Sequence, residues 1–174
     1  TWGEETCARK DDDEYGPHGI DLVKRNDGRY QIGVISHHPK ESVEMFELKK
    51  NDLGWEIIWR GCVNVPDKFY FNDLSLKKDG SFYASHMYKR DITMNEWFMI
   101  ALLKNNSGNI VLWENSNFTE IEGSEGSSPN GLVLDELRNY SYSNKSINKA
   151  KNYTIKKYII KKIISSKIRG NSLK

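Results

Sequence analysis

The sequence has little of what builds a disulfide scaffold or a helical membrane protein. It has two cysteines, Cys7 and Cys62, among 174 residues. The sequence alone does not decide whether these two cysteines form a disulfide. No run approaches the roughly 18 consecutive apolar residues that span a bilayer. The chain opens at Thr1 in polar sequence without a signal-peptide pattern, so we expect a processed or truncated chain whose compartment is open.

The familiar catalytic motifs are also absent. There is no glycine-rich phosphate loop, no Cys-x-x-Cys pair, no His-Glu-x-x-His motif and no nucleophile elbow. The chain is nevertheless 37% hydrophobic and 11% aromatic, which is enough apolar content for one packed domain and is not typical of a disordered protein. The four histidines therefore remain as candidates for catalysis.

Charge is divided unevenly along the chain. Residues 137–174 contain 11 Lys and Arg and no Asp or Glu, whereas residues 1–136 contain 15 basic residues and all 24 acidic ones. An acidic body argues against a general nucleic-acid surface, and it leaves room for a metal cation.

The basic tail allows two interpretations. Ile155, Ile159 and Ile163 fall at helical spacing with lysine pairs between them, so one hypothesis is a basic amphipathic helix that attaches to a membrane surface or to nucleic acid. The other is a low-complexity extension unrelated to the body, such as an out-of-frame end of the coding sequence. The loss of every acidic residue and every turn signal favours the second. We expect a domain at 1–136 and a low-complexity basic tail at 137–174.

Short β-like segments separated by turn signals make up the body from Ile20 onward. The turns contain Gly, Asn, Asp or Pro, as in Asn26-Asp27-Gly28, and recur at roughly ten-residue spacing, which is typical of an all-β fold. The predicted strands are Tyr30–Ser36, Val43–Leu48, Trp55–Arg60, Phe69–Leu76, Ser81–His86, Asn109–Glu114 and Leu132–Leu134. The stretch Ile92–Lys104 fits either one helix or another strand.

Several predicted strands carry apolar residues on both faces. Ile32 and Val34 alternate with Gly33 and Ile35 in one such strand. Strands buried on both sides are typical of stacked sheets, as in sandwiches or propeller blades. The sequence therefore predicts an all-β body of stacked sheets.

Polar residues in unusual places are candidates for binding a metal ion. Asn72-Asp73 lies inside an apolar predicted strand, where an amide and a carboxylate are costly to bury without partners. Asn130 opens another apolar strand, although a turn or cap role is the ordinary one for an asparagine before glycine. Asn and Asp oxygens suit Ca²⁺, which takes about six to eight oxygen ligands.

Four motifs occur in order along the body: Pro17-His18-Gly19-Ile20, Ser36-His37-His38-Pro39, Phe71-Asn72-Asp73 and Pro129-Asn130-Gly131. In order and spacing they resemble the serum paraoxonase/arylesterase family, over roughly residues 16 to 136. This family belongs to a calcium-dependent group of six-bladed β-propellers, with the senescence marker protein/gluconolactonase and strictosidine synthase relatives. The resemblance therefore implies an all-β, partial six-bladed β-propeller and Ca²⁺ as cofactor.

The resemblance also implies which residues hold calcium. Asn72 and Asn130 are implied as ligands of the catalytic calcium ion. Asp73 and the backbone carbonyl of Ile20 are implied as ligands of a buried structural calcium ion. A calcium ion can polarise the carbonyl of an ester or lactone and stabilise the oxyanion that forms on attack.

The same resemblance implies a histidine pair that activates water, formed by His18 and His38. His37 is the less favoured member, because the family's histidine directly precedes the proline. A neutral imidazole can accept the proton of water, and a second imidazole within hydrogen-bond reach would orient the first.

The length of the chain limits these expectations. A propeller blade needs about 40 to 50 residues and six blades roughly 240 or more, so we expect about three blades in residues 1–136. The family's remaining acidic calcium ligands should lie outside this chain. We therefore expect the 174-residue chain to be inactive or nearly so.

Three hypotheses follow for function. The first is a fragment of a calcium-dependent hydrolase whose small-molecule substrate is a lactone or an aryl ester. The second is a non-catalytic β-propeller binding protein that kept the scaffold and lost the chemistry. The third, ranked last, is a membrane or nucleic-acid binder that acts through the basic tail.

Overall fold

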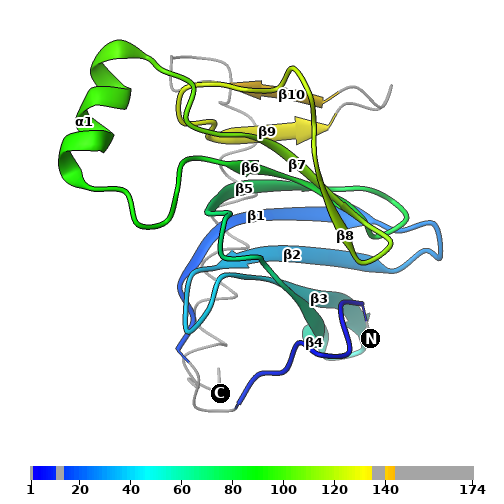
Figure 1. Ribbon diagram of the computed structural model, residues 1–174. Coiled ribbons are helices and arrows are strands. Elements are labelled where there is room, and N and C mark those ends of the chain that lie inside the picture. The colour runs from blue at the N-terminus through cyan, green and yellow to red at the C-terminus, as the bar shows by residue number, and fades with distance from the viewer. Residues whose placement is uncertain (1, 11–13, 135–139, 144–174) are drawn as a thin grey trace.

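The computed structural model describes residues 2–10, 14–134 and 140–143, the last of these for the backbone. The strands are β1 (Pro17–Lys24), β2 (Tyr30–Ser36), β3 (Ser42–Asn51), β4 (Gly54–Asn64), β5 (Phe71–Leu76), β6 (Phe82–His86), β7 (Asn109–Glu114), β8 (Asn117–Glu120), β9 (Gly131–Leu134) and β10 (Tyr140–Ser143). One helix, α1 (Met94–Leu103), lies between β6 and β7. The chain is all-β in class, as predicted (Figure 1).

The strands form three antiparallel sheets in chain order: β1-β2-β3-β4, β5-β6-β7-β8 and β9-β10. Side-chain oxygens tie the first strand of one sheet to the first strand of the next. Asp21 Oδ2 accepts from Leu76 N at 2.8 Å, and Ser75 Oγ accepts from Leu134 N at 3.1 Å. This repeated arrangement of meandering four-stranded sheets is that of part of a β-propeller, with two blades and two strands of a third.

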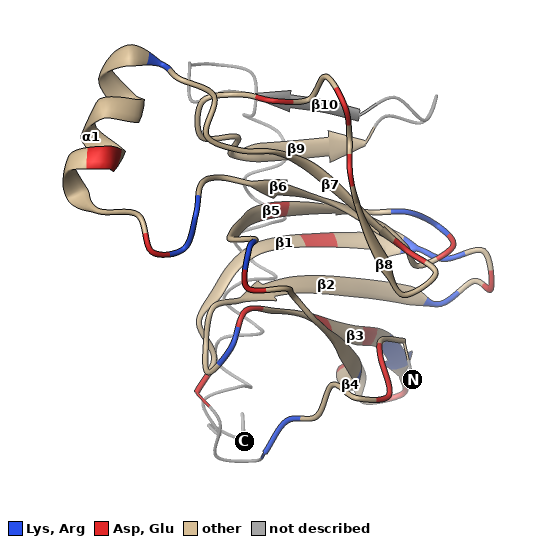
Figure 2. Cartoon of the chain, viewed as in Figure 1, with Lys and Arg blue, Asp and Glu red and all other residues tan. Residues whose placement is uncertain are grey.

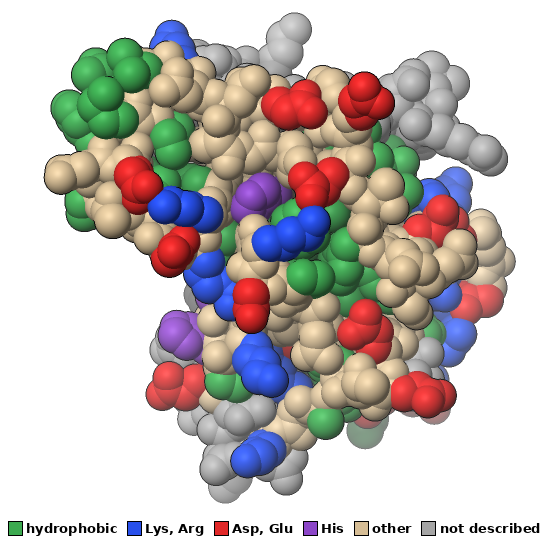
Figure 3. Space-filling model, viewed as in Figure 1, with side chains coloured by type: hydrophobic (Ala, Val, Ile, Leu, Met, Phe, Trp, Pro, Cys, Tyr) green, Lys and Arg blue, Asp and Glu red, His purple; other side chains and the backbone are tan. Residues whose placement is uncertain are grey.

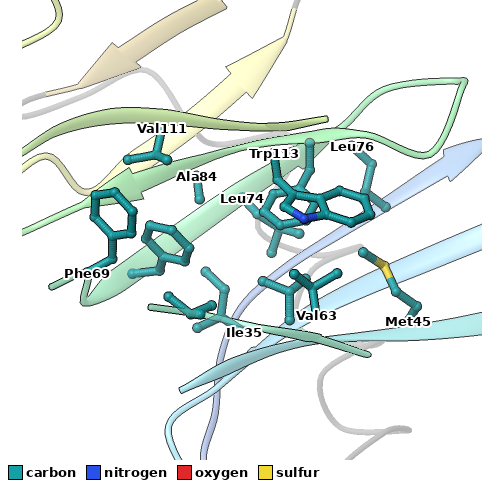
Figure 4. Close-up of a cluster of buried hydrophobic side chains, with 13 residues drawn as sticks. Ile35, Met45, Val63, Phe69, Leu74, Leu76, Ala84, Val111 and Trp113 are labelled. Carbon is teal, nitrogen blue, oxygen red and sulfur yellow. The ribbon is translucent and has the colours of Figure 1, made fainter. Parts of the chain in front are cut away.

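The main core lies between the first two sheets. Figure 4 shows Ile35, Met45 and Val63 of the first sheet facing Leu74 and Trp113 of the second and Phe69, which precedes β5. The other face of the first sheet buries a second cluster of Ile20, Ile32, Val34 and Phe46. Strand β2 is therefore buried on both faces, as its doubly apolar pattern predicted. Full burial of one such side chain contributes about 1.5–3 kcal/mol to folding.

The turn signals located most strands correctly. Strands β2 and β7 have the predicted bounds, and five others overlap their predictions. The ambiguous stretch 92–104 is a helix: Thr93 Oγ1 accepts from Glu96 N, and the Glu96 carboxylate accepts from Thr93 N, which forms a capping box. Strands β1, β8 and β10 were missed. Strand β1 contains Pro17 and Gly19, which predict turns rather than strands.

Helix α1 presents an apolar surface. None of its residues is buried, and Met94, Phe98 and Leu102 are more than half exposed. Figure 3 shows hydrophobic side chains gathered over this helix. None of the helices in the described residues is long and apolar enough to cross a membrane.

The N-terminal segment is bonded to strands β4 and β3. Cys7 and Cys62 form a disulfide, which the sequence left open, and Glu4 N donates to Cys62 O at 2.8 Å. Arg9 forms an ion pair at 2.7 Å with Glu44, whose side chain is fully buried. The predicted basic tail at 137–174 lies outside the described residues, apart from the backbone of β10.

Candidate functional site

The predicted site residues gather at one end of the sheets. His18 lies at the beginning of β1, His37 directly follows the end of β2, and Asn72 and Asp73 open β5. Asn130 directly precedes β9. Because β1 and β2 are antiparallel, the beginning of one lies beside the end of the other, at the left in Figure 1. Residues from four parts of the sequence therefore meet at a common edge.

The imidazole beside His18 belongs to His37. His18 Nδ1 lies 2.8 Å from His37 Nε2, and the two rings meet edge to face with centroids 5.0 Å apart. The resemblance implied His38 as the partner of His18, whereas the contact of 2.8 Å is made by His37; the catalytic roles of these rings stay a prediction. His37 is partly buried and faces His18, while the neighbouring His38 is exposed.

His38 contributes to the site through its backbone. Its carbonyl oxygen accepts from Arg9 Nη1 at 2.7 Å and from Ser36 Oγ at 2.9 Å. These bonds hold the turn that follows β2. This turn fixes the direction in which the side chain of His37 points.

A buried carboxylate, Glu41, completes the histidine pair and was missed by the sequence analysis. Its Oε2 lies 2.8 Å from His37 Nδ1, and its Oε1 accepts from Phe71 N at 3.0 Å. Its side chain is 2% exposed, and Arg90 Nη2 lies 3.8 Å from Oε2. No local motif marks Glu41, because its contact with Phe71 depends on the packing of β5 against the turn before β3.

The aromatic wall of the site is formed by Tyr70. Its ring lies 4.6 Å from the His37 ring and 5.8 Å from the Tyr88 ring. Burial, with the negative charge of Glu41 as a further contribution, raises the pKa of the Tyr70 hydroxyl. Tyr70 is therefore uncharged at neutral pH and supplies a ring surface rather than an anion.

The amide of Asn72 lies between the histidine pair and Met87. Asn72 Nδ2 is 3.4 Å from His18 Nε2 and 3.0 Å from Met87 Sδ. The residue is 8% exposed, so the amide is nearly buried within strand β5. The structure thus brings together His18 and Asn72, which lie 54 positions apart.

Asp73 and Asn130 meet through Ser85. Asp73 N donates to Ser85 Oγ at 3.0 Å, and the same hydroxyl donates to the carbonyl oxygen of Asn130 at 2.7 Å. Asp73 Oδ2 accepts from Leu132 N at 3.2 Å, two residues beyond Asn130. Figure 2 shows acidic residues inside strands β1 and β5, which are Asp21 and Asp73.

Gly19 lets strand β1 approach these residues closely. A Cβ atom on Gly19 would lie 2.5 Å from the carbonyl oxygen of Asn72 and 2.6 Å from Cα of Asp73. Any larger residue would push the two strands apart. Ile20, whose carbonyl was predicted as a ligand, follows directly and is buried.

The donor set fits calcium in kind. The predicted ligands offer amide, carboxylate and backbone carbonyl oxygens, which calcium prefers, and no thiolate or imidazole cluster of the zinc type. Within residues 2–10 and 14–134, no group of three or more His, Cys, Asp or Glu side chains is placed to hold a metal ion. Asn72, Asp73, Asn130 and Ile20 thus offer oxygens of the kind that calcium binds, but fewer than the six to eight that it typically takes.

A cavity of about 570 Å³ lies between the end of β6 and helix α1. Its lining includes His86, Tyr88 and Met99. His86 Nδ1 accepts from Tyr70 N at 3.0 Å, and burial lowers the pKa of the His86 imidazole. Tyr88 lines the cavity and its ring is 5.8 Å from the Tyr70 ring, and the Tyr70 ring in turn is 4.6 Å from the His37 ring. The cavity therefore lies next to the histidine site.

Fold and site together define a class of protein: an all-β chain of propeller type with a histidine pair beside buried amide and carboxylate oxygens. The model of the arylesterase family matches residues 5–169. The chain belongs to the arylesterase family, which confirms the relation that the sequence motifs predicted. The match runs past residue 136, so the predicted boundary between body and tail stays a prediction. No curated protein matches the chain.

Proposed function

We propose that this site belongs to a calcium-dependent hydrolase of aryl esters or lactones. The observation that carries the proposal is the 2.8 Å contact between His18 and His37, placed 3.4 Å from the amide of Asn72. Membership of the arylesterase family supports an ester as the substrate class. That the ester is an aryl ester or a lactone is part of our proposal and does not follow from the family match.

In this proposal His18 is the general base. An imidazole has an ordinary pKa of about 6.5 and is mostly neutral at neutral pH, so it can accept a proton from water. His37 binds the other ring nitrogen of His18 and stabilises the imidazolium that forms on proton transfer. General-base catalysis of this kind contributes typically about 10²–10⁴-fold to a rate.

In this proposal the side-chain oxygens of Asn72 and Asn130 are ligands of a catalytic calcium ion. The Asp73 carboxylate and the carbonyl oxygen of Ile20 are ligands of a structural calcium ion. Calcium, when bound, would act as a Lewis acid on the substrate carbonyl. The protein's own contribution is to fix these oxygens. The bonds of Ser85 Oγ with Asp73 N and with the carbonyl oxygen of Asn130 link the backbones of these two residues, which supports this role.

The test is hydrolysis by the purified protein of phenyl acetate and of a simple lactone, with calcium in excess and with chelator. We expect slow hydrolysis that the chelator abolishes, because the described residues supply only part of the calcium ligands. His18→Gln should lower kcat by about 10²-fold or more. His38→Gln is the matched control and should keep the activity, since the His38 ring is exposed and outside the cluster.

The second hypothesis, a non-catalytic propeller that binds small molecules, gives a different result in the same assay. It predicts no hydrolysis of either substrate at any calcium concentration. Hydrolysis that is insensitive both to the chelator and to His18→Gln would also reject the proposed site.

A further inference from the structure

A chain of hydrogen bonds runs from the buried Glu41 through His37 and His18 to Asn72. The bonds run from Glu41 Oε2 to His37 Nδ1 at 2.8 Å, and from His37 Nε2 to His18 Nδ1 at 2.8 Å. The last contact, from His18 Nε2 to Asn72 Nδ2, is 3.4 Å. Each imidazole thus uses both of its nitrogens within this chain.

The two ends of the chain fix the direction of every bond in it. An ionised carboxylate only accepts hydrogen bonds, so the proton of His37 is on Nδ1. In the neutral ring Nε2 then carries a lone pair and accepts from Nδ1–H of His18. His18 in turn has its lone pair on Nε2, which can accept from the amide nitrogen of Asn72. Donor and acceptor assignments agree from Glu41 to Asn72.

We infer that Glu41 is a positioning residue that sets the tautomers of both histidines and so places the basic nitrogen of His18 on the Asn72 side. The inference rests on the proposed function for its catalytic consequence. Without the carboxylate, each ring could carry its proton on Nε2 instead. In that state His18 Nε2 is already protonated and cannot accept a proton from water.

The second oxygen of Glu41 makes this arrangement rigid. Oε1 accepts from Phe71 N, the residue directly before Asn72, and the side chain is 2% exposed. The carboxylate is therefore held by β5 itself. It connects the histidine pair to the strand that carries Asn72 and Asp73, and so fixes the position of the histidines relative to these two residues.

The Glu41→Gln variant keeps the shape of the side chain but removes its charge and replaces one acceptor oxygen by a donor NH₂ group. If the amide oxygen keeps the bond from Phe71 N, its NH₂ group faces His37 Nδ1. A donor at that place requires the lone pair of His37 on Nδ1, so both tautomers reverse. Glu47→Gln is the matched control, because Glu47 is also a buried glutamate but binds Arg60.

The direct readout is ¹⁵N NMR of the imidazole nitrogens, at a pH well above the ordinary histidine pKa of about 6.5. We expect wild type and Glu47→Gln to carry the protons of His18 and His37 on Nδ1, and Glu41→Gln to carry them on Nε2. A merely structural role would not move these signals in a folded variant. Wild-type protein with His37 protonated on Nε2 would overturn the inference even if the variant does not fold.

Kinetics give the second readout. Glu41→Gln should lower kcat by about 10²-fold or more, since the general base is lost, with KM nearly unchanged. Unchanged tautomers in an active Glu41→Gln variant would reject the role of Glu41 and leave the proposed function standing. Reversed tautomers in a protein whose wild type hydrolyses neither substrate would reject the function and leave the role of Glu41 standing.

Discussion

Gly19 and Asp73 are in such close contact that a Cβ atom on Gly19 would lie 2.9 Å from Oδ1 of Asp73. This contact places the first strand of one sheet directly against the first strand of the next. His18 precedes Gly19 and Asn72 precedes Asp73, so the distance between the proposed base and the proposed calcium ligand depends on it. A glycine at position 19 is thus part of the geometry of the site.

The first prediction concerns this contact. Gly19→Ala should separate β1 from β5, because the nearest atoms to the new methyl group are backbone atoms of Asn72 and Asp73. We expect a loss of about 1–3 kcal/mol in the free energy of unfolding, which is usual for overpacking, and a loss of hydrolysis. Urea unfolding and the ester assay measure the two effects. An equally stable and active variant would show that the close approach is not needed.

The second prediction concerns calcium. Calcium at ten times its dissociation constant should stabilise the protein by about 1.4 kcal/mol, since it binds only the native state. Asn72→Ala and Asp73→Asn should each reduce this effect, because each removes a proposed ligand of one of the two calcium ions. Asp52→Asn, in an exposed turn, should keep it. Thermal unfolding with and without calcium measures the difference. Equal stabilisation of all four proteins would place calcium elsewhere.

The third prediction concerns the disulfide. Cys7 and Cys62 are 55 positions apart, and a bridge across such a loop contributes up to about 4 kcal/mol by restricting the unfolded chain. The double variant Cys7→Ala, Cys62→Ala should lose a large part of this amount. Guanidinium unfolding of wild type and variant provides the measurement. A loss below about 1 kcal/mol would contradict the chain-entropy argument.

The fourth prediction concerns pH. Burial lowers the pKa of the His86 imidazole below its ordinary value of 6.5. The unfolded chain therefore binds a proton at this residue more readily than the native protein does. The stability that His86 contributes is present above pH 6.5 and is lost as the pH falls through the lower native pKa.

His86→Asn should reduce this dependence, because an asparagine can still accept from Tyr70 N but does not titrate. As the pH falls below 6.5, we expect the unfolding free energy of the wild type to fall relative to that of the variant. Urea unfolding over this range measures it. A pH-independent difference would contradict the assignment of a lowered pKa to His86.

The sequence predicted local structure well where turn chemistry marks it. Asn26-Asp27-Gly28 marked the beginning of β2, because glycine and asparagine supply the backbone conformations of tight turns. Strand β1 was not predicted. Its Gly19 is needed for contact with β5 rather than for a turn, and a single sequence does not distinguish the two uses.

The site was predicted in part. The motifs singled out His18, Asn72 and Asp73, and these residues lie close together in the structure, while their roles stay a prediction. They did not identify the second histidine, because the choice between His37 and His38 depends on which way each side chain faces at the strand end. Glu41 was missed altogether. Its bond to Phe71 N spans 30 positions and exists only once the two sheets pack together.

The central claim is that the rings of His18 and His37 act as one unit, and a double-mutant cycle on kcat/KM for phenyl acetate tests it most directly. The variants are His18→Gln, His37→Gln and both together. Residues that act as a unit lose activity non-additively, so we predict that the double variant is about as slow as His18→Gln alone. Losses that multiply, or a His37→Gln variant as active as wild type, would contradict the account.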